Sequence, residues 1–396
     1  MKNVVEKQAF TIVYGGWYQR TTLHLSEIYD FLALGISTLP LDQTMLKKNR
    51  AKLQLSQVTR ETGELEYVRA QTKSGIEIRY YEDGLYILEL VSEDVVGAQT
   101  ILQEYFDHSL NPAIGYIFSL GAPTPKVLAN IKTTHPIVCA TTDRLPATYE
   151  INEKKFGRVY QKLDIDNVSV FKTETHIFII TAPESSESTR ELIELQIFFR
   201  EFKDQLGKYL SIHRSLWENI ARLKERKQLK AGEAAAIRGE LDRYQVTVDL
   251  ITSRMNQMGS YVKTRASISR RLHLDAHLTT LFQYKFEVLL DTLEYIKELW
   301  SMTVAYLRTA IDVVVDIQNQ GTKVSIQSLT AITTFGVLAN IIVFMTRTQD
   351  ILKFNAWSFV AVCSLAICAF AIDRIFRWIS KNKNYKLKFS ERSEKI

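Results

Sequence analysis

The segment VSIQSLTAITTFGVLANIIVFMT, residues 324–346, decides how we interpret the fold, because it contains no charged residue. As a helix it would be roughly 35 Å long, which exceeds the hydrocarbon thickness of a bilayer. Residues 354–372 form a second uncharged stretch, with charged residues on both sides. The two stretches predict a transmembrane hairpin whose helices are joined by a short extracytosolic loop, 347–353.

The tail, residues 373–396, carries eight basic and three acidic residues. Basic residues that flank a membrane span favour the cytoplasmic side. We therefore expect a basic cytosolic tail, both termini in the cytosol, and a multi-pass location in the cell (inner) membrane. The alternative is a helical hairpin buried inside a large soluble protein.

The composition of the 396 residues is that of a globular protein, with 46% hydrophobic and 24% charged residues. It excludes extensive disorder, collagen and disulfide-rich classes. The three cysteines have no CxxC spacing and so predict neither a disulfide framework nor a zinc site. Most of the net charge of +6 lies in the tail, and we expect no nucleic-acid partner.

The first 183 residues contain all seven prolines, which helix interiors exclude. This region, 1–183, is predicted to be a cytosolic α/β (or α+β) domain. A helix is expected over 93–108, and Glu82-Asp83-Gly84 predicts the turn of a β-hairpin. Alternation of apolar and polar residues predicts strands at 10–14, 76–81, 85–91, 114–120, 168–171 and 176–182.

The chain after Pro183 is predicted to be mostly helical, because no proline interrupts it. Antiparallel cytosolic helices are expected over 184–272, followed by a long stalk helix over 273–346 that continues into the first membrane span. The helical pieces themselves are expected at about 187–228, 231–271 and 273–345. In the third piece apolar residues recur every three or four positions and mark a buried face.

No sequence motif of an enzyme is present: the chain has no Walker A loop, GxGxxG, HExxH or nucleophile elbow. We therefore expect that the protein is not an enzyme. His273 and His277 are spaced to share one helix face and are candidate metal ligands. The alternative for this pair is the polar start of a helix.

Between Ile251 and Leu274 basic residues occur without any acidic residue. Such a helix could contact an anionic ligand or an acidic membrane surface. A solvated face, balanced by acidic residues elsewhere in the fold, is the alternative. The candidate anion ligands are Arg254, Lys263, Arg265, Arg270 and Arg271.

A mostly polar row follows the predicted stalk and first span at a seven-residue period. If several copies of this helix surround an axis, the row would line a pore. Ordinary helix packing is the alternative, because small polar residues also serve at close contacts between membrane helices. The candidate pore-lining residues are Asp312, Asp316, Asn319, Lys323, Thr330, Thr333, Val337, Asn340, Phe344 and Arg347.

This arrangement resembles the CorA family of divalent-cation channels and transporters. Ser328-Leu329-Thr330-Ala331-Ile332-Thr333 is similar to the Leu-Thr segment that opens the family's first span, and the basic tail includes Lys381-Asn382-Lys383-Asn384-Tyr385-Lys386. The family's Gly-Met-Asn is absent, and Arg347-Thr348-Gln349 stands at about its place. A ring of Arg347 would repel a cation, so the resemblance leaves the ion selectivity open.

The resemblance implies a homopentamer that contacts membrane lipid and the transported ion, with a cytosolic domain that gates the pore. A divalent cation or a signalling nucleotide is the ligand it suggests, and no cofactor is certain. The sequence thus predicts an oligomeric CorA-like membrane ion channel or transporter, opened by an anionic or nucleotide ligand. The alternatives are a membrane-anchored coiled-coil scaffold or tether without transport and, less favoured, an anchored nucleotide-dependent enzyme.

Overall fold

The structure is a computed structural model that describes residues 9–18, 24–118, 137–142, 145–225, 228–345 and 384–386, with scattered positions between 364 and 378. The chain divides into two compact units. The first consists of Met1–Leu210 and Thr252–Ile296, and the second of Ser211–Ile251 and Lys297–Ile396. The predicted domain boundaries stay predictions.

The first unit is built on a nine-stranded sheet with the strand order β2-β3-β4-β5-β1-β6-β9-β8-β7. Only β6 and β9 pair in parallel; the other neighbouring pairs that the structure describes are antiparallel. The strands are β1 (Phe10–Trp17), β2 (Leu55–Thr62), β3 (Glu66–Thr72), β4 (Glu77–Tyr81), β5 (Leu85–Ser92), β6 (Ile137–Thr141), β7 (Val159–Ile165), β8 (Val168–Thr173) and β9 (Ile177–Thr181).

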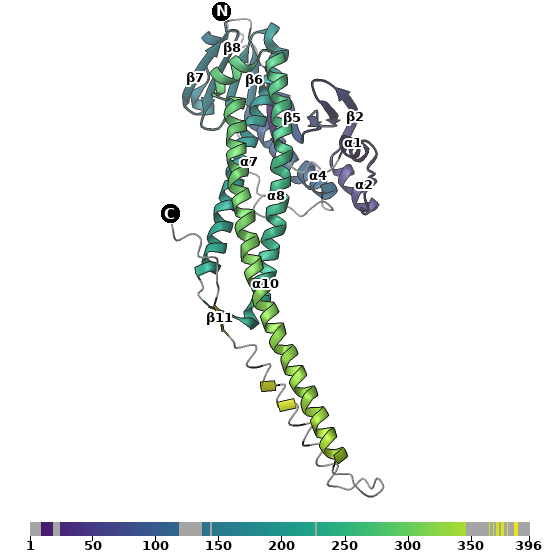
Figure 1. The fold of residues 1–396 in the computed structure, drawn as a ribbon. Helices are drawn as coiled ribbons and strands as arrows, with labels where there is room; N and C mark the ends of the chain where they lie inside the picture. Colours follow the sequence, from purple (N-terminus) through teal and green to yellow (C-terminus); the bar gives the residue numbers. More distant parts are fainter. Residues whose placement is uncertain are drawn as a thin grey trace, which may run out of the picture. The chain divides into compact units, whose positions relative to one another are not determined.

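Helices cover both faces of this sheet (Figure 1). Side chains alternate between the two faces of a strand, so Ile12 of β1 enters the core beneath the short helices, whereas Trp17 stacks on Phe202 of a long helix. One face packs against α1 (Leu25–Leu34), α2 (Gln43–Lys52), α3 (Val95–Tyr105) and α4 (Asn111–Ile117), and the other against α7 (Ser186–Glu225) and α8 (Ala231–Arg271). Short helical turns lie at Phe106–Leu110, Pro146–Thr148, Glu153–Phe156 (α6), Pro183–Ser185, Asp275–His277 (α9) and Leu278–Phe282.

The predicted sheet domain is confirmed in outline, and the hairpin with Asp83 and Gly84 in its turn joins β4 to β5. Strands were expected at the places of β1, β4, β5, β8 and β9, and the helix over 93–108 corresponds to α3. The predicted strand at 114–120 is wrong, because residues up to Ile117 belong to α4. Ile114 and Ile117 lie three positions apart and both reach the core from one helix face.

The long helices are present, and α7 and α8 lie close to the predicted pieces. The third, α10 (Phe286–Met345), begins later than 273 because the chain turns first. His273 and Gln283 adopt left-handed backbone conformations with φ of 55° and 59°, and these interrupt the helix on either side of α9. In the second unit, β10 (Gln228–Lys230) pairs with β11 (Asn384–Lys386) in an antiparallel manner.

The predicted membrane hairpin is wrong: among the described residues, no helix combines the length and apolarity that a bilayer crossing requires. The same finding contradicts the expected multi-pass location in the membrane. Hydroxyl groups recur in the part of α10 that falls within 324–346. Thr330, Thr333 and Thr334 donate hydrogen bonds of 2.7–3.0 Å to carbonyl oxygens of the preceding turn.

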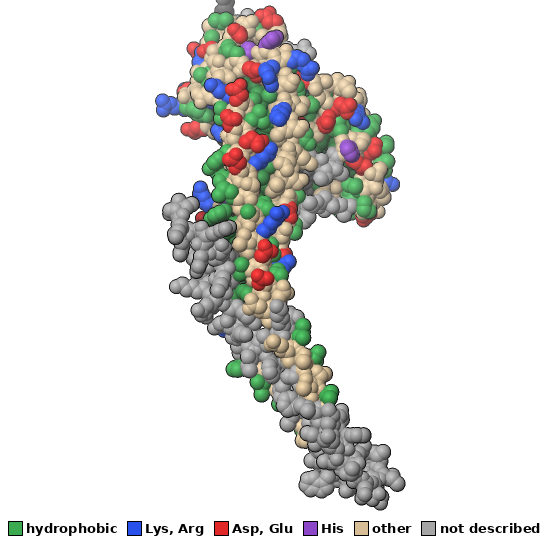
Figure 2. Space-filling view, viewed as in Figure 1, with side chains coloured by type: hydrophobic (Ala, Val, Ile, Leu, Met, Phe, Trp, Pro, Cys, Tyr) green, Lys and Arg blue, Asp and Glu red, His purple; other side chains and the backbone are tan. Residues whose placement is uncertain are grey.

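Other parts of the predicted hairpin lie outside the described residues. These are the loop 347–353, the second span 354–372 apart from scattered positions, and the tail 373–396 apart from β11 and a few single positions. Figure 2 shows hydrophobic side chains, without visible charged ones, along the far C-terminal part of α10. This agrees with the absence of charged residues between Val324 and Thr346.

Candidate functional site

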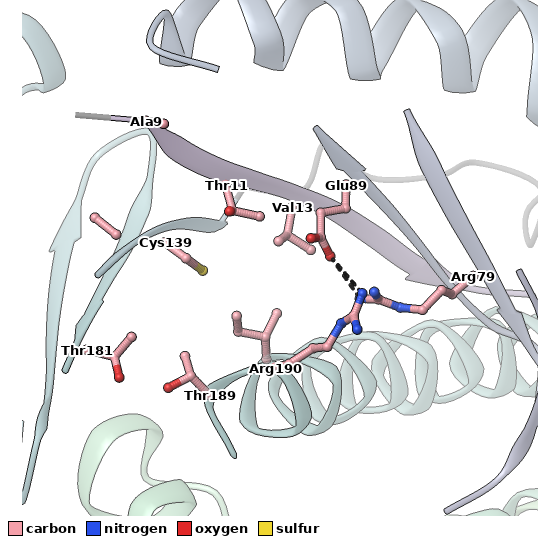
Figure 3. A pocket seen from close by; sticks show the side chains of 11 residues that line it. Ala9, Thr11, Val13, Arg79, Glu89, Cys139, Thr181, Thr189 and Arg190 are labelled. Atoms are coloured by element: carbon pink, nitrogen blue, oxygen red, sulfur yellow. Dashed lines mark ion pairs between the residues drawn. The ribbon is translucent and has the colours of Figure 1, made fainter. Parts of the chain in front are cut away.

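A cavity of about 490 Å³ lies on the face of the sheet that α7 covers (Figure 3). Strands β1, β4, β5, β6 and β9 and the first turns of α7 line it. Thr11 and Val13 face the cavity from β1, and Thr11 lies directly opposite Cys139 of β6. The volume falls in the range of small-molecule sites, roughly 300–1,000 Å³.

The two ends of the cavity differ in chemistry. Figure 3 shows three charged side chains at one end, Arg79, Arg190 and Glu89, and three smaller polar ones at the other, Cys139, Thr181 and Thr189. The two threonine hydroxyls already donate to carbonyl oxygens, Thr181 to Ala182 at 3.0 Å and Thr189 to Ser185 at 2.7 Å. Their oxygen lone pairs therefore remain to accept hydrogen bonds from a ligand.

Cys139 contributes a neutral group to the cavity. Burial raises the pKa of its thiol well above the ordinary value. Because the thiolate is the reactive and metal-binding form of cysteine, this side chain is suited to packing and not to nucleophilic chemistry.

Arg79 is the most buried charged group at the cavity, with 3% of its side chain exposed. It lies on β4 and forms ion pairs with Glu77 at 2.9 Å and with Glu89 of β5 at 3.1 Å. Glu194 of α7 lies 3.5 Å from its Nε. Burial alone would lower the pKa of Arg79, but the surrounding carboxylates raise it, so the guanidinium stays charged.

Arg190 extends over the cavity from the first turns of α7, and 43% of its side chain is exposed. Its Nη2 lies 2.7 Å from Glu77 and 3.7 Å from Glu89. An exposed ion pair of this kind contributes little to stability, about 0–1 kcal/mol. Arg190 can therefore exchange a glutamate for an anionic ligand at small cost.

The charged cluster continues beneath α7 to α8 through Arg265, which is 1% exposed. Arg265 forms a two-pronged ion pair with Asp83 in the β4–β5 turn, with N–O distances of 2.7 and 3.1 Å. Its Nη1 lies 3.8 Å from Glu194, which also accepts a hydrogen bond of 2.5 Å from Tyr81. Asp83, Glu194 and Arg265 thus connect the sheet, α7 and α8.

Burial changes the pKa values of the carboxyl groups in this cluster. Burial raises the pKa of Glu194 and of Glu89, and this effect exceeds the attraction of the neighbouring arginines. Ion pairing acts in the opposite direction on Arg265, whose pKa is raised by Asp83 despite burial. The glutamates, and not the arginines, are therefore the groups that can change charge.

The cavity is suited to a small polar molecule with an acidic group. Arg190 and the N-terminal end of α7, where the helix dipole is positive, favour negative charge. Arg79, which lines the cavity and stays charged, adds a second positive charge. Thr181 and Thr189 at the other end can accept hydrogen bonds from hydroxyl or amino groups of the same molecule.

Among the predicted pore-lining residues, those whose side chains the structure describes do not line this cavity. They follow one another along α10, and the side chains of Asp312, Asp316, Asn319, Thr330, Thr333 and Val337 are exposed. The side chains of Lys323, Asn340 and Phe344 and the whole of Arg347 lie outside the described part of the chain. The pore-lining role stays a prediction.

The five candidate anion ligands on α8 do not converge on one site. Arg254 and Arg265 are buried, and Arg265 is occupied by Asp83. Lys263, Arg270 and Arg271 are exposed, and Arg271 forms an ion pair with Glu64. The arginines at the cavity, Arg79 and Arg190, belong to other elements.

The two candidate metal ligands are separated by a change of backbone direction. His273 is exposed at the left-handed position after α8, and His277 lies in α9 with its Nε2 3.4 Å from Asp166. The described part of the chain contains no group of three or more His, Cys, Asp or Glu side chains that could hold a metal ion.

Sequence reasoning missed the residues of the cavity, although one signal was present. Arg79 stands between Ile78 and Tyr80 in a largely buried strand, Glu77–Tyr81, and a charged residue at such a position requires a buried partner. Glu89 follows ten residues later in the same hairpin, whereas Glu194 follows 115 residues later, so only the placement of α7 on the sheet identifies Glu194.

Fold and site together define an α/β sheet protein with long helices and a ligand-sized polar cavity. Neither a protein-family model nor a curated protein sequence matches the chain. A weak structural similarity exists to the complete structure of the CorA magnesium transporter from Methanocaldococcus jannaschii, with 9% identity and a TM-score of 0.28. It covers 63% of this chain and 92% of that one, and at this TM-score it supports no argument about fold or function.

Proposed function

We propose that this protein is a ligand-responsive regulatory protein, whose sheet domain binds a small anionic molecule in the cavity between the sheet and α7. The observation that carries the proposal is Arg190: it is half-exposed, lies on the first turns of α7 and holds two glutamates at the edge of a 490 Å³ cavity. An acidic ligand can take the place of those glutamates.

Binding would be communicated through the charged cluster. Arg190 and Glu194 lie on one face of α7, four positions apart, and both belong to the network that includes Arg79. When a ligand binds Arg190, the ion pairs of Arg190 with Glu77 and Glu89 are lost, and those of Arg79 with the same two glutamates remain. This alters the attachment of α7 to the sheet. Because α7 is a continuous helix of 40 residues, a change at its start reaches its far end.

The ion-channel hypothesis depended on a membrane hairpin that the structure does not support, so the proposed function rests on the cavity. The anionic or nucleotide ligand expected from the sequence is retained, but its binding residues are now Arg190 and Arg79 and not the basic residues of α8. Ion transport is not needed for this proposal.

The test is isothermal titration calorimetry of the full-length protein with inorganic phosphate, glutamate, AMP and ATP. At least one of these probes should bind. Replacing Arg190 by glutamine removes a charged hydrogen-bond donor and should weaken that binding roughly tenfold or more. Thr11→Val, which removes a hydroxyl group without changing the shape of the side chain, should weaken binding less.

Arg222→Gln provides the matched control, because Arg222 is an exposed arginine of the same helix that hydrogen-bonds locally to Glu218 and Asn219. It should bind the probe like the unaltered protein. Equal affinity of the Arg190→Gln and Arg222→Gln proteins, or no binding of any probe, would contradict the proposal.

A further inference from the structure

A second cavity, of about 310 Å³, lies between α7 and the first turns of α10 and is separate from the polar cavity. The two share no lining residue. Its walls come from α7 between Phe199 and Leu210 and from α10 up to Ile296, together with the turn that contains Gln283. Both helix segments belong to the first unit.

Aromatic rings close one end of this second cavity. Gln283 adopts a left-handed conformation, and this turn places Tyr284 on Phe199. The two rings stack with centroids 4.6 Å apart and an interplanar angle of 5°. Phe199 is the first residue of α7 that lines the cavity, and Tyr284 lies just before the start of α10, so the two helices run in the same direction along the cavity.

Positive charge and apolar surface are segregated along this direction. Lys203 and Lys285 lie at the end marked by the stacked rings, and both side chains are exposed. Toward the other end the walls are aliphatic and include Leu206, Leu210, Leu289 and Ile296. Among the described residues that line the cavity, none is acidic.

Two further residues indicate that the cavity is open to an apolar ligand. Val288 lines it and is 58% exposed, so aliphatic surface is accessible from outside the cavity. Gly207 lines it from inside α7, and a Cβ added there would meet no atom within 4 Å. Glycine weakens a helix relative to alanine, so this open space exists at a cost to helix stability.

We propose that this second cavity binds a medium-chain fatty acid. The carboxylate lies between the ammonium groups of Lys203 and Lys285, and the acyl chain follows the aliphatic wall toward Leu210 and Ile296. The helix from Lys203 to Leu210 is about 10 Å long, which matches an octanoate or decanoate chain. Charge complementarity at one end and apolar walls at the other favour an amphiphile over a purely polar or purely apolar ligand.

The experiment titrates the full-length protein with decanoate below its critical micelle concentration and, in parallel, with decanol. Gly207→Leu fills the cavity and should weaken decanoate binding at least tenfold. Gly239→Leu is the matched control, because Gly239 lies inside α8 and its Cβ also meets no atom within 4 Å. It should bind decanoate like the unaltered protein.

The charged end is tested with the double variant Lys203→Gln, Lys285→Gln. It should weaken decanoate binding several-fold and leave decanol binding unchanged. The proposal is overturned if the unaltered protein does not bind decanoate, or if Gly207→Leu binds it as well as Gly239→Leu does. It is also overturned if Gly207→Leu instead lowers the native mass in sedimentation, since the cavity would then be occupied by a second copy of the chain.

Discussion

At the residue scale, the most consequential side chains are two buried arginines that neutralise buried carboxylates. Arg79 serves the sheet side of the cluster and Arg265 the α8 side, and Glu194 lies between them. Removing one member of such a cluster leaves a charge without a partner in a medium of low polarity, which is strongly destabilising. The cluster therefore fixes the position of α7 and α8 on the sheet, and its member Arg79 also lines the polar cavity.

The protonation of Glu194 gives a testable pH dependence. A carboxyl group whose pKa is higher in the folded protein contributes stability below its unfolded pKa, near 4.5, and loses it as the pH rises through the folded value. Glu194→Gln keeps the neutral form at every pH. The free energy of unfolding of the variant, relative to the unaltered protein, should therefore rise between pH 4.5 and neutral pH.

Urea titrations across this pH range measure the effect, which is worth about 1.4 kcal/mol for each pH unit between the folded and unfolded pKa values. Glu218→Gln, at an exposed position of the same helix, serves as the control. A stability difference between the Glu194→Gln and unaltered proteins that stays constant with pH would show that the pKa of Glu194 is not raised by folding.

At the element scale, the β4–β5 hairpin depends on a glycine. Gly84 has a φ of 87°, in the region that other residues rarely adopt, and an added Cβ would clash with the carbonyl oxygen of Tyr18. The peptide N–H of Tyr18 donates a hydrogen bond of 2.8 Å to the carbonyl oxygen of Gly84. The turn therefore positions Asp83 for Arg265 and holds the end of β1 at the same time.

Two alanine substitutions separate these effects. Gly75 has a φ of 86°, and a Cβ added there would have no atom within 4 Å. Gly75→Ala should therefore lower the free energy of unfolding only by the cost of holding alanine in a left-handed conformation, roughly 1–2 kcal/mol. Gly84→Ala should cost about 1–3 kcal/mol more, because the Cβ also has to displace its neighbour. Chemical denaturation of both variants provides the comparison. Equal losses would mean that the turn relaxes without strain.

At the scale of the whole molecule, the second unit carries exposed apolar side chains on α10. Ile326, Leu329 and Val337 are 58%, 64% and 58% exposed. Large apolar groups gathered on one helix are typical of an interaction surface. We propose, in agreement with the oligomer expected from the sequence, that this part of α10 contacts other copies of the chain.

Analytical ultracentrifugation of the full-length protein should then give a mass above that of one chain, and five copies would match the predicted pentamer. Replacing Ile326, Leu329 and Val337 by glutamine should shift the mass toward the monomer. Val246→Gln removes a similarly exposed side chain, at 61%, from α8 and should leave the mass unchanged. A monomeric unaltered protein would refute the oligomer.

Some elements could be predicted because their determinants are local. The β4–β5 hairpin follows from alternating side chains around Glu82-Asp83-Gly84, and α7 and α8 follow from the proline-free sequence after Pro183. The strand expected at 114–120 failed because a short apolar run fits a buried helix equally well. The membrane span expected at 324–346 is contradicted because, among the described residues, no helix is long and apolar enough to cross a bilayer.

The amino-acid sequence by itself determined a sheet domain followed by long helices, since periodicity, turn residues and proline content act over a few neighbouring positions. Only the tertiary structure decided the site. Arg79 meets Glu194, and Arg265 meets Asp83, across more than a hundred residues of chain. Such pairs form when strand register and helix packing bring distant charges into one buried volume, where each must find an opposite charge because water no longer solvates it.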